Sequence, residues 1–213
     1  MASKTRTKIV KTAKKMFNER RYGNVSTLAI AREIEISEGN VWYYFNNKRD
    51  LLDEITTEFL EVVDRRLAIL PTGSDDVLQQ YAKMLATLVE EFRNYGFIYR
   101  DQADFGEHAD ELQLRLPKIY ADGIEQGRAF YQAMIDADLL DWPEERLVTL
   151  STNVTIILRY DLEFQRESGT DKQGGDPIAN TIEQHFSLFE HAMRPDALVR
   201  LKEYISQTNI HVQ

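Results

Sequence analysis

The chain has 213 residues, of which 43% are hydrophobic, and it contains no cysteine. This composition is typical of a soluble globular protein, and it excludes disulfides and thiolate metal sites. The net charge of −9 is unevenly divided: residues 1–50 carry 11 Lys and Arg and 5 Asp and Glu, a net of +6, whereas residues 51–213 have a net of −15. A basic head on an acidic body predicts a phosphate-binding domain over 1–50 and a non-binding regulatory domain over 51–213.

The sequence shows no membrane-spanning pattern. The longest uncharged run, Leu147 to Leu158, has 12 residues and includes Ser, Asn and three Thr. That run is too short and too polar to cross a bilayer. The N-terminal MASKTRTKIVKTAKK lacks the apolar core of a secretory signal. We therefore expect a cytoplasmic protein with no membrane partner.

Residues 6–20 are predicted to form the first helix, because apolar residues recur at helical spacing with lysines opposite them. The apolar positions are Ile9, Val10, Ala13, Met16 and Phe17. Residues 21–24 end this helix. Met1 to Thr5 are expected to form a mobile arm, with Lys4 and the adjacent Arg6 positioned to contact a phosphate or the minor groove. The alternative for this arm is a frayed terminus.

Residues 26–52 contain two short apolar-patterned segments separated by Glu35-Ile36-Ser37. Each segment is too short to be stable alone in water. A shared seam of Ile30, Ile34, Ile36 and Val41 can hold them together. This pattern predicts a helix-turn-helix, in which Ser26 or Thr27 caps the first helix and Ser37 caps a recognition helix from Glu38 to about Tyr44.

The recognition helix supplies most of the candidate DNA contacts. Gly39 lets the backbone approach DNA, and Asn40 can pair with adenine or bond a phosphate. Trp42, Tyr43 and Tyr44 cannot all be buried on one helix face, so at least one faces outward, where a phenol can donate to phosphate. The ammonium of Lys48 opens the next helix and can bind a phosphate. The predicted DNA-contacting residues are Lys4, Arg6, Thr27, Ser37, Glu38, Gly39, Asn40, Trp42, Tyr43 and Lys48.

This N-terminal pattern resembles the signature of the TetR family of bacterial transcriptional regulators. The matching positions are Thr27, Ala31, the run from Ile36 to Phe45, Lys48, Leu51 and Leu52. The Y-F-x-x-K-x-x-L ending makes the match more specific than a generic helix-turn-helix. The sequence departs from the family pattern at Glu35, where a turn glycine is usual, at Asn40 and at Trp42-Tyr43.

The rest of the chain has helical periodicity without strand-like alternation, so we predict an all-α fold with a helical bundle after the three-helix reader. The expected helices cover residues 48–70, 77–92, 112–137 (with a kink or restart at Pro117), 144–167, 177–193 and 197–206. Residues 94–110 are predicted to be irregular, and 168–176 to form a loop. The 48–70 helix is expected to link reader and body.

The resemblance implies that the body holds an effector pocket and a dimer interface formed by the last two long helices. Pocket candidates are Tyr81, Phe92, Phe97, Tyr99, Arg100, Phe105, Tyr120, Tyr131, Arg159 and Tyr160. The alternative is core packing for the aromatics and an acidic partner for each arginine. Interface candidates are Leu147, Leu150, Val154, Ile157, Leu158, Ile178, Ile182, Phe186 and Phe189. Their alternative is the core of the single chain.

Metal and catalytic motifs are not found. His108, His185, His191 and His211 have no ligand-like spacing. Asp104 and His108 lie in an acidic stretch that could bind a divalent ion, with a solvated acidic segment as the preferred alternative. We predict no metal site, no cofactor and no enzymatic activity.

The expected function is that of a ligand-responsive transcriptional regulator, a repressor. It would bind a palindromic double-stranded DNA operator as a homodimer, and a small-molecule effector would release it. The alternatives are a non-specific architectural DNA-binding protein and an enzyme that uses the helical body.

Overall fold

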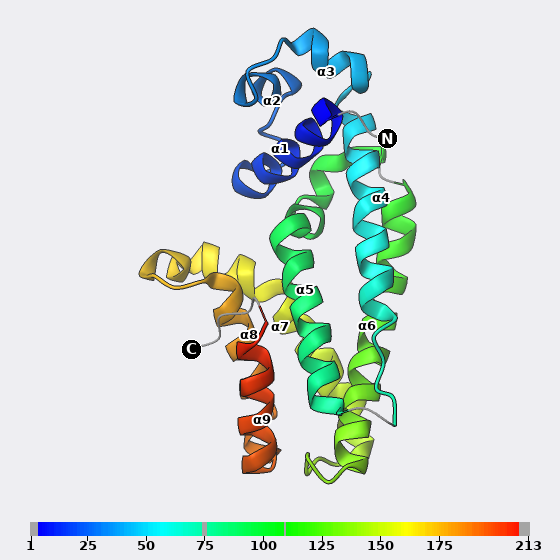
Figure 1. Cartoon of the computed structure of the whole chain (residues 1–213), viewed down its shortest axis with the longest axis vertical. Helices are drawn as coiled ribbons and strands as arrows, with labels where there is room; N and C mark the ends of the chain where they lie inside the picture. Colours follow the sequence, from blue (N-terminus) through cyan, green and yellow to red (C-terminus); the bar gives the residue numbers. More distant parts are fainter. Residues whose placement is uncertain (1–3, 74–75, 109, 209–213) are drawn as a thin grey trace. The chain divides into compact units, whose positions relative to one another are not determined.

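The computed structural model describes residues 4–73, 76–108 and 110–208; within them, the side chains of residues 106–108, 110, 111 and 173 are not described. All the regular secondary structure assigned in these ranges is helical, which confirms the predicted all-α class (Figure 1). The α-helices are α1 (Lys4–Arg20), α2 (Thr27–Glu33), α3 (Glu38–Tyr44), α4 (Lys48–Leu67), α5 (Val77–Arg100), α6 (Asp110–Asp136), α7 (Leu147–Ser168), α8 (Pro177–Ser187) and α9 (Pro195–Ser206). Short 3-10 segments are η1 (Gln102–His108), η2 (Glu144–Arg146), η3 (Thr170–Gln173) and η4 (Glu190–Ala192).

The chain divides into two compact units. The first comprises residues 1–63 and 91–115, and the second comprises residues 64–90 and 116–213. Helices α4, α5 and α6 each begin in one unit and end in the other. This division differs from the predicted boundary after residue 50, because the first unit also contains the start of α4 and the end of α5.

The first unit is built on α1, whose predicted apolar positions are all buried. The two helices of the predicted helix-turn-helix form as expected from their caps. Ser26 Oγ accepts a hydrogen bond from the Ala29 backbone N–H at 3.1 Å, and Ser37 Oγ accepts one from Asn40 N–H at 3.2 Å. Each serine therefore satisfies an N–H group at a helix start that has no partner within its helix.

The turn between α2 and α3 uses a non-glycine residue in the left-handed region. Glu35 has φ +60°, and Ile36 N–H donates to the Ala31 carbonyl at 3.0 Å across it. An L-residue pays about 1–2 kcal/mol in this conformation. Burial of Ile30, Ala31, Ile34 and Val41 around the turn offsets that cost.

Several body helices end at positions other than those predicted. Helix α5 continues to Arg100, through a segment predicted to be irregular, because a kink at Tyr95 turns Phe97 and Ile98 into the core. Helix α6 passes through Pro117 as one helix, since Leu116 and Ile119 are both buried and offset the bond that proline removes.

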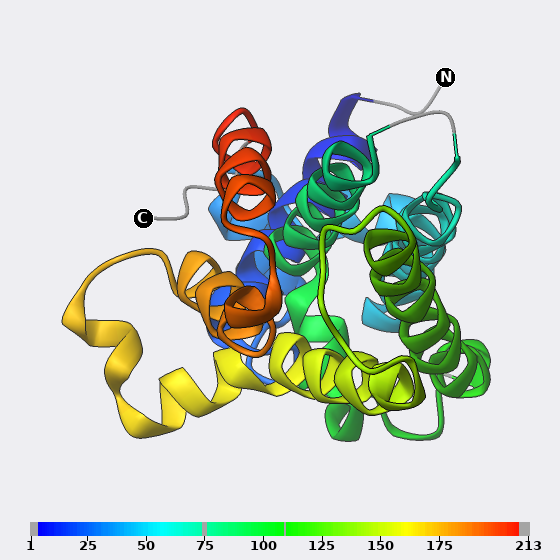
Figure 2. The same ribbon diagram turned by 90° about the horizontal axis from the view of Figure 1, so that it is seen from below.

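The second unit contains the pair α7 and α8, which pack against each other. Helix α8 stops at Ser187 instead of continuing to residue 193, and η4 follows it. Gly169, with φ +76°, ends α7 in the left-handed conformation typical of a helix C-cap. Figure 2 shows the C-terminal end of α7 and η3 projecting outward before the chain returns as α8. Among the described residues, no helix is long and apolar enough to span a membrane.

The Glu35 turn yields a prediction on stability. Glu35→Gly should raise the free energy of unfolding by roughly 0.5–1 kcal/mol, because glycine reaches positive φ without steric cost. Chemical denaturation would measure the change. Glu33→Gly in α2 is the matched control and should instead destabilise the protein, by about 1 kcal/mol. A Glu35→Gly variant less stable than the unchanged chain would show that the turn is not strained.

Candidate DNA-binding site

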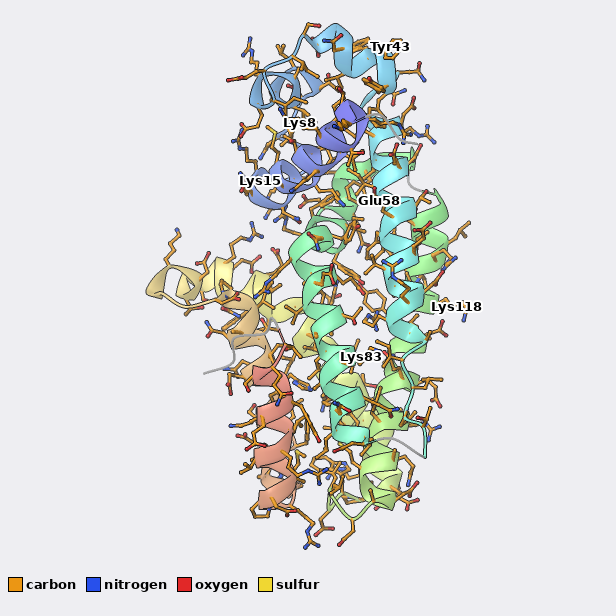
Figure 3. The ribbon with its side chains drawn as sticks, viewed as in Figure 1. Lys8, Lys15, Tyr43, Glu58, Lys83 and Lys118 are labelled. Atoms are coloured by element: carbon orange, nitrogen blue, oxygen red, sulfur yellow. The ribbon has the colours of Figure 1, made fainter. Side chains whose placement is uncertain are left out.

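Helix α3 has two large aromatic side chains exposed on its outer face. Trp42 is 55% exposed and Tyr43 81% exposed, whereas Val41 and Phe45 are buried. Tyr43 points away from α3 in Figure 3, with its ring edge-to-face against Tyr44 at 5.0 Å between centroids. Two of the three consecutive aromatics thus face outward, as the helical geometry requires.

Gly39 and Asn40 extend this exposed face into the first turn of α3. A Cβ placed on Gly39 would meet only Ser37 Oγ within 4 Å, at 3.8 Å. The protein therefore leaves open space around Gly39, and a backbone without a side chain lets a DNA groove approach closely. The amide of Asn40 has both donor and acceptor groups for a base edge.

Thr27 and Glu38 contact each other. Thr27 Oγ1 donates to Glu38 Oε1 at 2.7 Å, which joins the starts of α2 and α3. This bond orients the carboxylate of Glu38, which would otherwise be free to approach phosphates of like charge. Ser37 uses its oxygen as a helix cap, and its hydroxyl proton can still donate to a phosphate.

The predicted N-terminal arm is helical from Lys4 onward, while Met1 to Ser3 lie outside the described residues. Lys4 is exposed. Arg6 donates to Glu54 Oε1 at 2.5 Å, and its guanidinium carbon lies 5.2 Å from the centre of the Phe45 ring. Arg6 therefore anchors α1 to α4 and α3, and a DNA contact from it would share the guanidinium with Glu54.

The side chain of Lys48, predicted to bind a phosphate, contacts Tyr22 instead. Its ammonium donates to the backbone carbonyl of Tyr22 and lies 3.7 Å from the centre of the Tyr22 ring. Burial lowers the pKa of the Lys48 ammonium from its ordinary value. The ammonium is thus turned toward the protein, and the predicted phosphate contact would require it to leave Tyr22.

The C-terminal turn of α1 is capped by Arg100 together with Asp101. Arg100, a predicted pocket residue, donates to the carbonyls of Phe17 at 2.7 Å and Asn18 at 2.9 Å. It also bonds the carboxylate of Asp101 at 2.6 and 2.8 Å. Asp101 Oδ2 in turn accepts the backbone N–H of Tyr22 at 2.8 Å. The alternative reading of Arg100, an acidic partner, is the one the structure shows.

Four other predicted pocket residues also belong to the first unit: Phe97, Tyr99 and Phe105 are buried in its core, and Phe92 is partly exposed. Phe97 packs on Phe17 with 5.1 Å between ring centroids, and Phe105 packs on Tyr22 at 5.0 Å. Tyr99 lies between Phe59 and Phe92. These rings support α1 and the loop after it.

The pocket candidates of the second unit include a buried chain of hydrogen bonds. Tyr81 Oη is 3.0 Å from Tyr131 Oη and 2.6 Å from His185 Nε2, and His185 Nδ1 is 3.2 Å from the Ile182 carbonyl. Since a carbonyl only accepts, Nδ1 carries the proton and Nε2 accepts from Tyr81. Burial lowers the pKa of His185 to about 4, so the ring is neutral at pH 7.

The remaining candidates lie nearer the surface of the second unit. Arg159 Nε donates to Tyr120 Oη at 2.8 Å, and Tyr160 is 57% exposed. A separate cavity of about 560 Å³ opens beside the start of α5 and the end of α6. It is lined by Pro71, Thr72, Gly73, Asp76, Val77, Ala133, Asp136, Ala137, Leu139 and Arg200, none of which was a predicted pocket residue.

Most of the predicted dimer-interface side chains are buried within the single chain. The buried residues are Leu147, Leu150, Val154, Leu158, Ile182, Phe186 and Phe189, and only Ile157 and Ile178 are partly exposed. These buried residues belong to the core of the single chain, which was the alternative given for them. The exposed apolar side chains of α7 are Val148, Ile156, Tyr160 and Phe164, and of these only Tyr160 was singled out from the sequence, as a pocket residue.

Metal ligation finds no support in the described part of the chain, where no group of three or more His, Asp and Glu side chains could hold an ion. In the acidic stretch with Asp104 and His108, the side chains of His108 and its acidic neighbours lie outside those described, as does His211.

The first three helices of the chain contain a helix-turn-helix, α2 and α3, whose second helix is capped and exposed. This arrangement defines a DNA-binding protein of the helix-turn-helix class. The family model for the N-terminal region of bacterial regulatory proteins of the tetR family matches residues 9–55, and the TetR bacterial transcriptional repressor model matches residues 58–201. The chain belongs to the TetR family of bacterial transcriptional regulators, which is not a family of enzymes.

Comparisons with individual proteins agree with this family. A crystal structure of a TetR-family transcriptional regulator from Marinobacter aquaeolei VT8 is 23% identical, covers 95% of this chain and 99% of its own, and has a TM-score of 0.76. The uncharacterized HTH-type transcriptional regulator YuxN of Bacillus subtilis is 27% identical over 55% of this chain. The probable regulator YttP of the same organism is 26% identical over 49%. These alignments span 37% and 50% of the two curated relatives.

The open space at Gly39 yields a prediction on DNA binding. Gly39→Glu should weaken binding at least about a hundredfold, because like-charge contacts at an interface cost several kcal/mol. The fold should remain, since the protein itself leaves room for a side chain there. Gel-shift titration and circular dichroism would measure both properties. Gly123→Glu on α6, where an added Cβ would meet nothing within 4 Å, is the control and should bind DNA normally. Retained binding by Gly39→Glu would place the DNA away from α3.

Proposed function

We propose that this protein is a ligand-responsive repressor, which binds a palindromic operator as a homodimer in the cytoplasm and is released by a small-molecule effector. The observation that carries this proposal is the exposed face of α3, with Gly39, Asn40, Trp42 and Tyr43 set on a rigid apolar seam. The word repressor in the description of the matching family model supports the direction of regulation.

Dimerisation follows from the size of the reading surface. One recognition helix of 7 residues contacts few base pairs, so specific binding needs a second half-site.

We place the interface on the exposed side of α7. Ile156, Tyr160 and Phe164 are 51%, 57% and 65% exposed. They follow each other at intervals of four residues, within about 80° of the helix circumference. An apolar row of this kind fits a second copy of the same helix.

The effector would bind in the second unit. The buried chain Tyr131, Tyr81 and His185 lies among Phe130, Phe186 and Phe189, and its three side chains are all neutral at pH 7. A neutral, largely aromatic site favours an uncharged effector with one polar group, because a charge would lose its hydration there without a partner. Tyr120, Arg159 and Tyr160 remain candidates for contacts nearer the surface.

Selection of binding sites from random DNA would test the central claim. The expected result is one inverted repeat whose half-site centres lie about one helical turn, roughly 10 base pairs, or more apart. Equal affinity for all sequences with a steep dependence on salt would contradict the proposal and favour the architectural alternative. Because the proposed effector site in the second unit is neutral, we expect neutral aromatic compounds, and not organic anions, to release the protein from that operator.

The exposed row on α7 yields a prediction on assembly. Phe164→Glu should raise the dimer dissociation constant at least about tenfold, because truncating or charging an aromatic anchor typically removes 2 kcal/mol or more. Sedimentation equilibrium would measure it. Val199→Glu on α9, where the side chain is 58% exposed, is the control and should leave the dimer intact. An unchanged dimer in Phe164→Glu would remove α7 from the interface.

A further inference from the structure

Helix α5 is interrupted by a kink within the first unit. Tyr95 has φ −133° and ψ +15°, outside the helical region, although α5 continues on both sides of it. Kinks of this kind have identifiable causes, among them a side chain inserted into the ladder of backbone hydrogen bonds. Here that side chain comes from α1.

The amide of Asn18 takes the place of a helix hydrogen bond at this kink. In a regular α-helix the N–H of Phe97 would donate to the carbonyl of Arg93. Phe97 N–H instead donates to Asn18 Oδ1 at 2.9 Å, and Asn18 Nδ2 donates to the Arg93 carbonyl at 3.1 Å and the Asn94 carbonyl at 3.0 Å. One side-chain amide therefore bridges the two groups that a straight helix would join directly.

Asparagine is suited to this bridge for a chemical reason. Its short amide offers an acceptor and donors side by side. An aspartate would still accept from Phe97 N–H, but its second oxygen would face two carbonyl oxygens. An alanine would reach neither group, and the longer glutamine would need a different position of α1.

The C-terminal half of α1 is attached to α5 at two further points. One turn before Asn18, Lys14 Nζ lies 3.3 Å from Tyr95 Oη and 2.7 Å from Glu58 Oε2 of α4 (Glu58 is labelled in Figure 3). Beyond the kink, Arg100 donates to the Phe17 and Asn18 carbonyls. The kink and the end of α1 consequently share one bonded assembly.

We propose that Asn18 is a positioning residue for DNA binding, which fixes the direction in which α1 presents the helix-turn-helix by holding the kink of α5 open. A straightened α5 would restore its own bond between Phe97 and Arg93 and would expel the Asn18 amide. Since α5 begins in the second unit at Val77, the kink gives that unit a covalent route to the reader. This route adds to the one predicted through α4, and it rests on the proposed function.

Two properties make the proposal testable by substitution. The two bonds from Asn18 Nδ2 are solvent-exposed, so water can satisfy the carbonyls once the amide is removed and the chain should still fold. Asn24 provides the matched control, because its amide donates only within the α1 end, to the Arg20 carbonyl at 3.0 Å.

The experiment compares the full-length chain with Asn18→Ala, Asn18→Asp and Asn24→Ala. Three quantities are measured: melting by circular dichroism, affinity for the operator selected above, and hydrogen exchange of residues 91–100 with and without that operator. Both Asn18 variants should remain helical and bind at least about fivefold more weakly, the lower end of typical coupling between sites. Asn24→Ala should bind within about twofold of the unchanged chain.

The exchange measurement separates positioning from a merely structural role. Coupling is reciprocal, so operator binding should slow exchange of residues 91–100 in the unchanged chain and not in the Asn18 variants. Lower melting with unchanged affinity and retained protection by operator would overturn the proposal. Failure to select any operator would instead contradict the proposed function. In that case exchange without DNA still decides whether Asn18 holds the kink, and equal rates in all chains would refute the bridge.

Discussion

The structure of the first unit depends on how the C-terminal turn of α1 is held. Helix ends leave carbonyl groups without partners, and the N–H and carbonyl groups after them need partners as well. Arg100 bonds the carbonyls of Phe17 and Asn18, Asp101 accepts the Tyr22 N–H, and Lys48 donates to the Tyr22 carbonyl. Side chains from α4 and α5 thereby fasten the connection from α1 to α2. The helices that follow are too short to be stable without that support.

In this arrangement two of the predicted DNA-contacting cations hold the helices together, whereas the exposed face of α3 is uncharged. Arg6 and Lys48 are engaged with Glu54 and with Tyr22, so they position the helices. The exposed face of α3 carries uncharged groups that can form specific hydrogen bonds or lie against phosphates: Gly39, Asn40, Trp42 and Tyr43. Specific reading of DNA rests on polar groups aimed at base edges, while cations supply general attraction.

Helices α4 and α5 each have residues in both units of the chain. Helix α4 starts directly after α3, and α5 ends against the last turn of α1. Under the proposed function, a change in the second unit that moves either helix would alter the support of the reader. The second unit itself has a neutral polar chain inside an aromatic core, which binding of an uncharged molecule could rearrange at small electrostatic cost.

The sequence by itself determined the elements whose signals are local. The apolar seam predicts α2 and α3, Ser37 fixes the start of α3, and Ser26 or Thr27 marks the start of α2, because caps and periodicity act within a few positions. Only the tertiary structure decided the partners across long separations. Arg100 caps a helix 82 residues earlier, Lys48 turns inward, and α5 continues past Tyr95 because Asn18 replaces its missing bond. It also decided which apolar residues of α7 face the core, since Leu150 and Ile156 are chemically alike and differ only in what the fold places against them.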